Sequence, residues 1–196
     1  MYKMKSVLVF CGSSEGNDPE VIKQGYELGS TLARQNITLV YGAGKVGIMG
    51  KVAEGALSKN GKVIGVIPEF LKVKEVVHLG LTELHTTENM HKRKLLMHDL
   101  SDGIISLPGG YGTLEELFEM ITWAQLGLHQ KPVGILNVNG FFDGLLVFLR
   151  EMVEKKFLKQ ENYEMLLVET EIQILLDRMK SYKPAVTPKW IKKDQL

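Results

Sequence analysis

Short apolar runs alternate with longer amphipathic segments along most of the chain. The runs are rich in Val, Ile and Leu and end at small or polar turn residues, so we predict strands at residues 6–11, 37–41, 62–67, 103–107 and 132–136. The segments between them place apolar residues at helical spacing, which predicts helices at residues 19–35, 47–59, 89–100, 114–126, 142–155 and 172–179. We interpret residues 69–88 as a loop with a short strand at 81–84.

This alternation predicts an α/β fold, a Rossmann-like doubly wound parallel sheet with helices on both faces. At 196 residues the chain fits a single domain, residues 1–196. In such sheets ligands bind outside the carboxyl ends of the strands. Cys11, Tyr41, Pro68 and Pro108 all fall at that edge, so we expect the loops that follow them to converge.

The most informative turn follows the strand at 103–107 and opens the helix at 114–126. It reads Pro108-Gly109-Gly110-Tyr111-Gly112-Thr113. Glycines let the backbone approach a phosphate, and the unpaired N–H groups at a helix start point at it. Glu116 adds a carboxylate about one turn away. We therefore predict a phosphorylated substrate beside a working carboxylate, which the helix N-terminus should keep ionised. The alternative is a capping box, in which Thr113 and Glu116 only satisfy the helix start.

Arg93 shares the inward apolar stripe of the helix at 89–100 with Leu96, Met97 and Leu100. An inward guanidinium near a sheet edge suits phosphate or ribose oxygens. The alternative is a stem that packs on the stripe while the head reaches water. Lys94 lies partly on another face, where it could bind the phosphate or remain at the surface.

A second glycine run, Gly42 to Gly47, matches G-x-G-x-x-G between a strand and a helix, and Glu69 could serve as its ribose-binding acid. This leaves a nicotinamide-dependent enzyme as a competing hypothesis. In dinucleotide folds, however, the run follows the first strand, whereas here it follows the second. At the end of the first strand, Gly12 and Ser13 form either a nucleotide contact or an ordinary loop. Cys11 is more typical of packing than of a nucleophile.

Composition narrows the class of protein. The 24 Lys and Arg residues nearly balance the 23 Asp and Glu residues, so we expect no nucleic-acid or membrane partner. A single cysteine fits a reducing compartment, and without a signal-peptide pattern we expect a cytoplasmic protein. The five histidines lack zinc-ligand spacing and are interpreted as surface or cap residues, so no metal is predicted.

Residues 108–116, preceded by Met90-His91-Lys92-Arg93-Lys94, resemble the paired signature of the Lonely Guy family. Those enzymes are cytokinin riboside 5′-monophosphate phosphoribohydrolases, and bacterial members were long labelled lysine decarboxylases. The resemblance extends from the first strand to about Phe157, while Ala43 and Lys45 depart from the family's glycine- and serine-rich pattern. It implies hydrolysis of the N-glycosidic bond of AMP or N6-modified adenine nucleotides, with no cofactor. A pyridoxal-phosphate decarboxylase does not fit a chain of this size.

The resemblance also implies site residues. Arg93 and Glu116 are the expected catalytic pair. The expected substrate-binding residues are Gly12, Ser13, Gly44, Glu75, Lys94, Gly109, Gly110, Tyr111, Gly112, Thr113, Leu114, Glu115 and Thr122. Thr122 lies about 120° around the helix from Glu116, which suggests that it serves a partner subunit's site. A homodimer is therefore expected, with Trp123 and Leu126 adding apolar area to its interface. A non-catalytic nucleotide carrier or sensor remains the alternative from another class.

Overall fold

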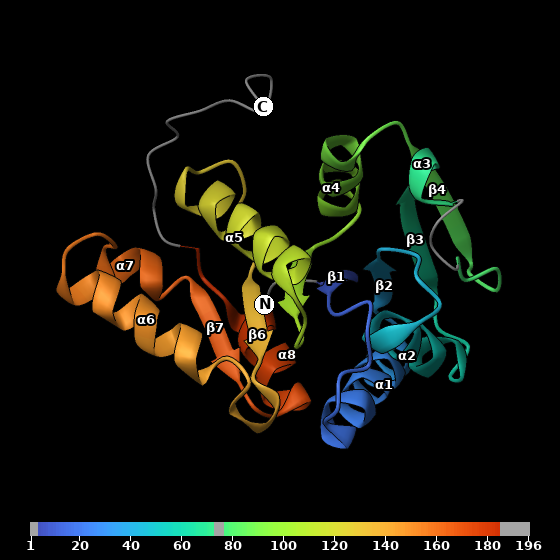
Figure 1. The fold of residues 1–196 in the computed structure, drawn as a ribbon, viewed down its shortest axis with the longest axis horizontal. Coiled ribbons are helices and arrows are strands. Elements are labelled where there is room, and N and C mark those ends of the chain that lie inside the picture. Colours follow the sequence, from blue (N-terminus) through green and yellow to red (C-terminus); the bar gives the residue numbers. More distant parts are fainter. Residues whose placement is uncertain (1–3, 73–76, 185–196) are drawn as a thin grey trace.

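The computed structural model describes residues 4–72 and 77–184 (Figure 1). Within these residues the centre is a seven-stranded sheet in which all paired strands run parallel. The strands are β1 (Ser6–Phe10), β2 (Thr38–Tyr41), β3 (Val63–Pro68), β4 (Glu83–Thr87), β5 (Gly103–Ser106), β6 (Val133–Leu136) and β7 (Leu166–Glu169). Their spatial order is β4-β3-β2-β1-β5-β6-β7.

The strand order reverses direction at β1, which pairs with β2 on one side and with β5 on the other. Val7 lies opposite Gly103 and Phe10 opposite Ser106, so the two strands end at the same level. In open α/β sheets, the crevice at such a switch point is where ligands bind. The loops that follow β1 and β5 are therefore the first place to look for a site.

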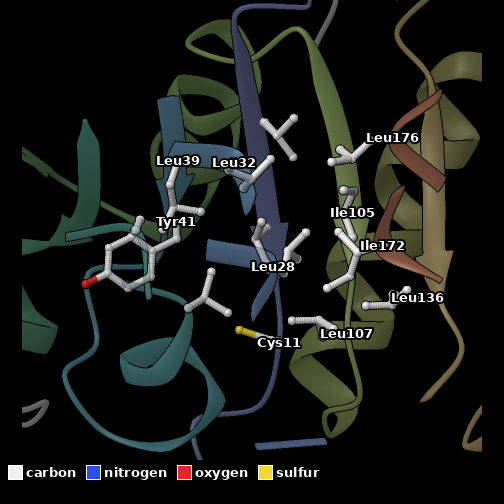
Figure 2. Packing of buried hydrophobic residues seen from close by; sticks show 14 of the residues in the cluster. Cys11, Leu28, Leu32, Leu39, Tyr41, Ile105, Leu107, Leu136, Ile172 and Leu176 are labelled. Carbon is white, nitrogen blue, oxygen red and sulfur yellow. The ribbon is translucent and has the colours of Figure 1, made fainter. Parts of the chain in front are cut away.

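Helices cover both faces of the sheet. The cluster that contains Leu28 and Leu32 packs the helices α1 (Pro19–Arg34), α2 (Gly47–Leu57) and α8 (Ile172–Ser181) on one face (Figure 2). The cluster that contains Leu117 and Met120 packs the helices α4 (Met90–Asp99), α5 (Tyr111–Gln125) and α6 (Asp143–Glu154) on the other. The short elements are α3 (Glu69–Lys72), η1 (Val138–Gly140) and α7 (Gln160–Tyr163).

The predicted fold class is confirmed, and the five predicted strands correspond to β1, β2, β3, β5 and β6. The short strand expected at 81–84 lies instead at Glu83–Thr87, at an edge of the sheet where its residues are half-buried or exposed. No strand was predicted for β7, because Leu166–Glu169 is a four-residue edge strand of a kind that apolar periodicity identifies poorly. The helix expected at 114–126 begins earlier, at Tyr111.

Candidate active site

The loops after β1 and β5 touch each other at the switch point. The N–H of Gly12 donates to the carbonyl of Pro108 across 3.0 Å. Helix α5 then starts at Tyr111 with Gly110 as its N-cap, and no side chain of the described residues caps it. The first N–H groups of a helix have no partner within the helix, so this end of α5 offers several donors to an anion.

The structure explains the three glycines of this turn, Gly109, Gly110 and Gly112, in different ways. A Cβ at Gly109 would lie 2.2 Å from Thr113 Oγ1 and 2.8 Å from the backbone nitrogen of Gly12, so close packing requires glycine there. A Cβ at Gly110 or Gly112 would meet no atom of the described residues within 4 Å. The space at these two positions opens into a cavity, and it is therefore available to a ligand.

That cavity has a volume of about 310 Å³ and lies over the ends of β1, β2 and β5. Its lining includes Gly12, Ser13, Gly42, Arg93, Thr113 and Glu116. A second cavity of about 480 Å³ adjoins it and shares Gly12, Ser13 and Gly110. The expected convergence of loops is thus confirmed for those after β1, β2 and β5, whereas Pro68 does not line this cavity.

The Arg93 side chain points inward, and the residue is 6% exposed. Its Nε donates to the carbonyl of Val66 at 3.1 Å, and its Nη2 donates to the carbonyl of Gly42 at 3.0 Å. A Cβ at Gly42 would lie 2.2 Å from that nitrogen, so the glycine makes room for the guanidinium. The third nitrogen, Nη1, lies 3.8 Å from the sulfur of Met90, which is a weak acceptor. Nη1 can therefore donate a hydrogen bond to a ligand. The alternative in which the Arg93 head reaches water is wrong.

Glu116 lines the same cavity and is partly buried there. Burial raises the pKa of its carboxyl to about 7, while the positive charges of Arg93 and Lys94 oppose the shift and the carboxylates of Glu115 and Glu119 add to it. The expectation that the helix N-terminus keeps Glu116 ionised is wrong. Because α5 begins at Tyr111, Glu116 lies beyond the first turn, where the helix dipole acts most strongly.

The capping-box alternative is also wrong. The N-cap of α5 is Gly110, so Thr113 lies inside the first turn and is not the cap. Thr113 is buried at 4% exposure and packs against Gly109 at the cavity wall. Neither Thr113 nor Glu116 is needed for capping, and both are free to serve the cavity.

The other expected binding residues divide into groups. Tyr111 lines the cavity and is 94% exposed. Leu114 packs against the core below α5, and Thr122 lies exposed on that helix, outside the cavity lining. Lys94 does not line the cavity, and its ammonium lies between Glu115 and Glu119. Glu75 lies outside the described residues.

The second glycine run does not form an open phosphate loop. The spaces where Cβ atoms would lie at Gly42, Gly44 and Gly47 are filled by the Arg93 guanidinium, the Met49 side chain and the Ser13 backbone. Gly44 also pairs with Val77 in an isolated antiparallel bridge. Glu69 is exposed on α3 and pairs with Lys72. This packing argues against a dinucleotide pyrophosphate in the loop.

Some features of the site were not predicted. Met49, Met90 and Met97 line the cavity, and of these only Met97 was expected to point inward, on the apolar stripe of its helix. The interpretation of the histidines as surface or cap residues is wrong for His98 and His129, which are 2% and 7% exposed and lie with ring centroids 4.8 Å apart. The described residues hold no cluster of three or more potential metal-ligating side chains, and none of their helices is long and apolar enough to span a bilayer.

A glycine-lined helix start, a buried arginine and a protonatable carboxylate at the switch point define an α/β protein with a site suited to a phosphorylated ligand. The family model described as "Possible lysine decarboxylase" matches residues 49–179. The chain belongs to this family. Its relatives are cytokinin riboside 5′-monophosphate phosphoribohydrolases.

Cytokinin riboside 5′-monophosphate phosphoribohydrolase LOG1 of Arabidopsis thaliana is 43% identical over 182 residues, which cover 93% of this chain and 85% of the relative. The probable enzyme LOGL6 of Oryza sativa subsp. japonica is 42% identical over 93% of this chain and 73% of the relative. Among solved structures, the molybdenum cofactor binding protein from Rippkaea orientalis has a TM-score of 0.68 at 23% identity, covering 90% of this chain and 96% of that one. That likeness concerns the fold alone.

Proposed function

We propose that this protein hydrolyses the N-glycosidic bond of adenine-type nucleoside 5′-monophosphates, such as AMP and cytokinin riboside 5′-monophosphates. The products are the free base and ribose 5-phosphate. The convergence of Arg93 and Glu116 on the cavity at the start of α5 is the observation that carries this proposal. The activity of its relatives, which are cytokinin riboside 5′-monophosphate phosphoribohydrolases, agrees with it. The proposal takes residues 1–196 as one domain.

In the proposed mechanism, the 5′-phosphate binds the backbone N–H groups at the start of α5, beside Thr113. Arg93 donates to phosphate or ribose oxygens and fixes C1′ against Glu116. As the bond from C1′ to the base breaks, its electron pair leaves with the base and positive charge develops at C1′. The Glu116 carboxylate stabilises that charge and accepts a proton from the water that attacks C1′, whose hydroxyl stays on C1′. The departing base takes up one proton from solvent, and Glu116 later returns its proton to solvent.

A pKa of about 7 suits this role, because the carboxylate is available at neutral pH and binds a proton readily. A carrier that only holds a nucleotide gains little from a buried carboxylate at this position. Its burial costs free energy that a neutral side chain would not. The chemistry of Glu116 therefore favours an enzyme over a carrier.

The direct test is to incubate the protein with AMP and with isopentenyl-AMP, without added metal or nicotinamide, and to separate the products by chromatography. We expect free base and ribose 5-phosphate in equal amounts. Intact nucleotide after incubation of both substrates with well-folded protein would replace the enzyme by the carrier or sensor hypothesis.

We also propose a homodimer that works in the cytoplasm. The apolar surplus expected on α5 is not there, because Trp123 is 6% exposed and packs edge-on against His98. The exposed apolar surface that supports a dimer lies instead on α6, which covers the same face of the sheet. On this helix Val147 and Phe148 are 62% and 57% exposed. Light scattering should give twice the 22.0 kDa of the chain, and Phe148→Glu should weaken the dimer. A fully active monomer would refute a shared site.

A further inference from the structure

Lys94 is a buried cation held between two carboxylates. Its Nζ lies 2.5 Å from Glu115 Oε1 and 2.8 Å from Glu119 Oε2, and its side chain is 11% exposed. Burial disfavours the charged ammonium, but hydrogen bonds and charges from both glutamates outweigh it and raise the pKa of Lys94. The side chain therefore stays charged at working pH. The ammonium donates a hydrogen bond to Glu115 and is ion-paired with Glu119 as well, which leaves it poorly placed to bind a phosphate.

This ion-pair cluster lies directly beside the proposed catalytic pair. Arg93 precedes Lys94 on α4, and Glu116 lies on α5 between the two glutamates that Lys94 contacts. Further along the same two helices, the rings of His98 and Trp123 pack edge to face with centroids 5.5 Å apart. Helices α4 and α5 are thus joined at both of these levels, and Lys94 provides the contact beside Arg93 and Glu116.

The geometry points to Lys94 as a positioning residue that fixes α4 against α5, so that Arg93 and Glu116 face one substrate, and that offsets the charge of the carboxylates beside Glu116. This inference rests on the proposed function, since it assigns Lys94 a part in the same reaction. It also separates Lys94 from the residues that touch the substrate.

The charges around Glu116 show why the offset matters. Arg93 and Lys94 face it from α4, Glu115 and Glu119 from its own helix, and the Cys11 thiol from the end of β1. Like charges four apart on a helix, as at Glu115 and Glu119, repel each other unless a cation lies between them. Loss of the Lys94 charge leaves both carboxylates acting on Glu116 and raises its pKa further. A larger fraction of Glu116 is then protonated at neutral pH.

The test compares Lys94→Met, which keeps the buried stem, with Lys94→Arg, which restores the charge. For Lys94→Met we expect kcat on AMP to fall at least about twofold at pH 7 and to recover as pH rises, with KM within about threefold of wild type. The midpoint of the acid limb of the kcat/KM profile should shift to higher pH by at least about half a unit in Lys94→Met, and Lys94→Arg should restore the wild-type midpoint. Glu119→Gln should shift the midpoint to lower pH.

Lys92→Met is the matched control. Lys92 lies on the same helix and pairs with Glu88 at 2.6 Å, but the two side chains are 53% and 77% exposed. Removing this charge should leave the acid limb where it is, because solvent screens an exposed pair. A Lys94→Met loss that is equal at every pH overturns the inference. So does a tenfold rise in KM at unchanged kcat, which would make Lys94 a substrate ligand.

A second measurement separates this inference from the proposed function. Carbon-13 NMR of the glutamate carboxyls follows the titration of Glu116 without turnover, with its signal assigned by its loss in Glu116→Gln. Wild-type protein that leaves AMP intact refutes the proposed function. A Glu116 midpoint that is unmoved by both Lys94→Met and Glu119→Gln refutes the role of Lys94, whether or not AMP is cleaved.

Discussion

Replacing Glu116 by Gln should inactivate the enzyme and stabilise its fold. The amide keeps the shape of the side chain but cannot accept a proton, so turnover of AMP should fall by at least about 100-fold. The free energy of unfolding should rise, because the native state of the wild type buries a carboxylate whose pKa is raised to about 7 from an ordinary 4.5. At pH 8 this shift corresponds to a cost of about 3 kcal/mol, which is the upper limit of what Gln recovers.

The sign follows from proton binding. The folded state binds the Glu116 proton more tightly than the unfolded state does, so the cost is absent below the unfolded pKa and grows as pH rises through about 7. The advantage of Glu116→Gln should therefore be large at pH 8 and shrink below about 1 kcal/mol at pH 5. Urea unfolding at both pH values measures it, alongside chromatographic turnover assays.

Glu154→Gln is the control for this comparison. Glu154 ends α6 and is exposed, so its replacement should change stability by no more than about 0.5 kcal/mol and leave turnover intact. Two results would contradict the reasoning. A Glu116→Gln protein that is less stable than wild type at pH 8 would mean that the carboxylate is structurally required. One that keeps full turnover would remove Glu116 from the chemistry.

Three further predictions concern the same cavity. Arg93→Ala should raise the KM for AMP and lower kcat together, because a phosphate or ribose contact acts in ground and transition states alike; wild-type kinetics would remove Arg93 from the site. Gly110→Ala should raise KM with Tm changed by no more than about 2 °C. Gly109→Ala should lower Tm, because its Cβ falls 2.2 Å from Thr113 Oγ1, and calorimetry that ranks the two variants the other way contradicts the packing. The kcat/KM for AMP should fall about tenfold per pH unit below about 7, since Glu116 must be ionised to act as a base, and a flat profile from pH 5.5 to 8 would rule that out.

The sheet could be predicted from the sequence because its central strands are buried on both faces. β1, β3 and β5 carry continuous apolar runs, and a run of that kind bounded by turn residues has few other interpretations. The edge strand β4 is half-buried or exposed and carries a mixed sequence, and the edge strand β7 is only four residues long with one buried residue, Leu167. Their strand structure comes from pairing with a neighbour, which no local pattern encodes.

The state of the site's charges could not be predicted from the sequence. The inward position of Arg93 followed from helical spacing alone, and the structure confirms it. For Glu116, spacing suggested a carboxylate ionised by a helix start, whereas burial in the folded site has the larger effect and raises its pKa. Burial depends on what the other loops bring to the cavity, so a motif fixes which group is present but not its proton affinity.

The two glycine runs show where motif interpretation ends. Both follow a strand and precede a helix, and both match patterns associated with phosphate binding. In the run from Gly42 to Gly47, the guanidinium of Arg93 and other protein atoms already occupy the glycine spaces. At Gly110 and Gly112 those spaces are open and face the cavity. One run therefore makes room for the Arg93 guanidinium, and the other leaves space open to the cavity. Together they place the arginine and the room for a ligand at the same switch point of the sheet.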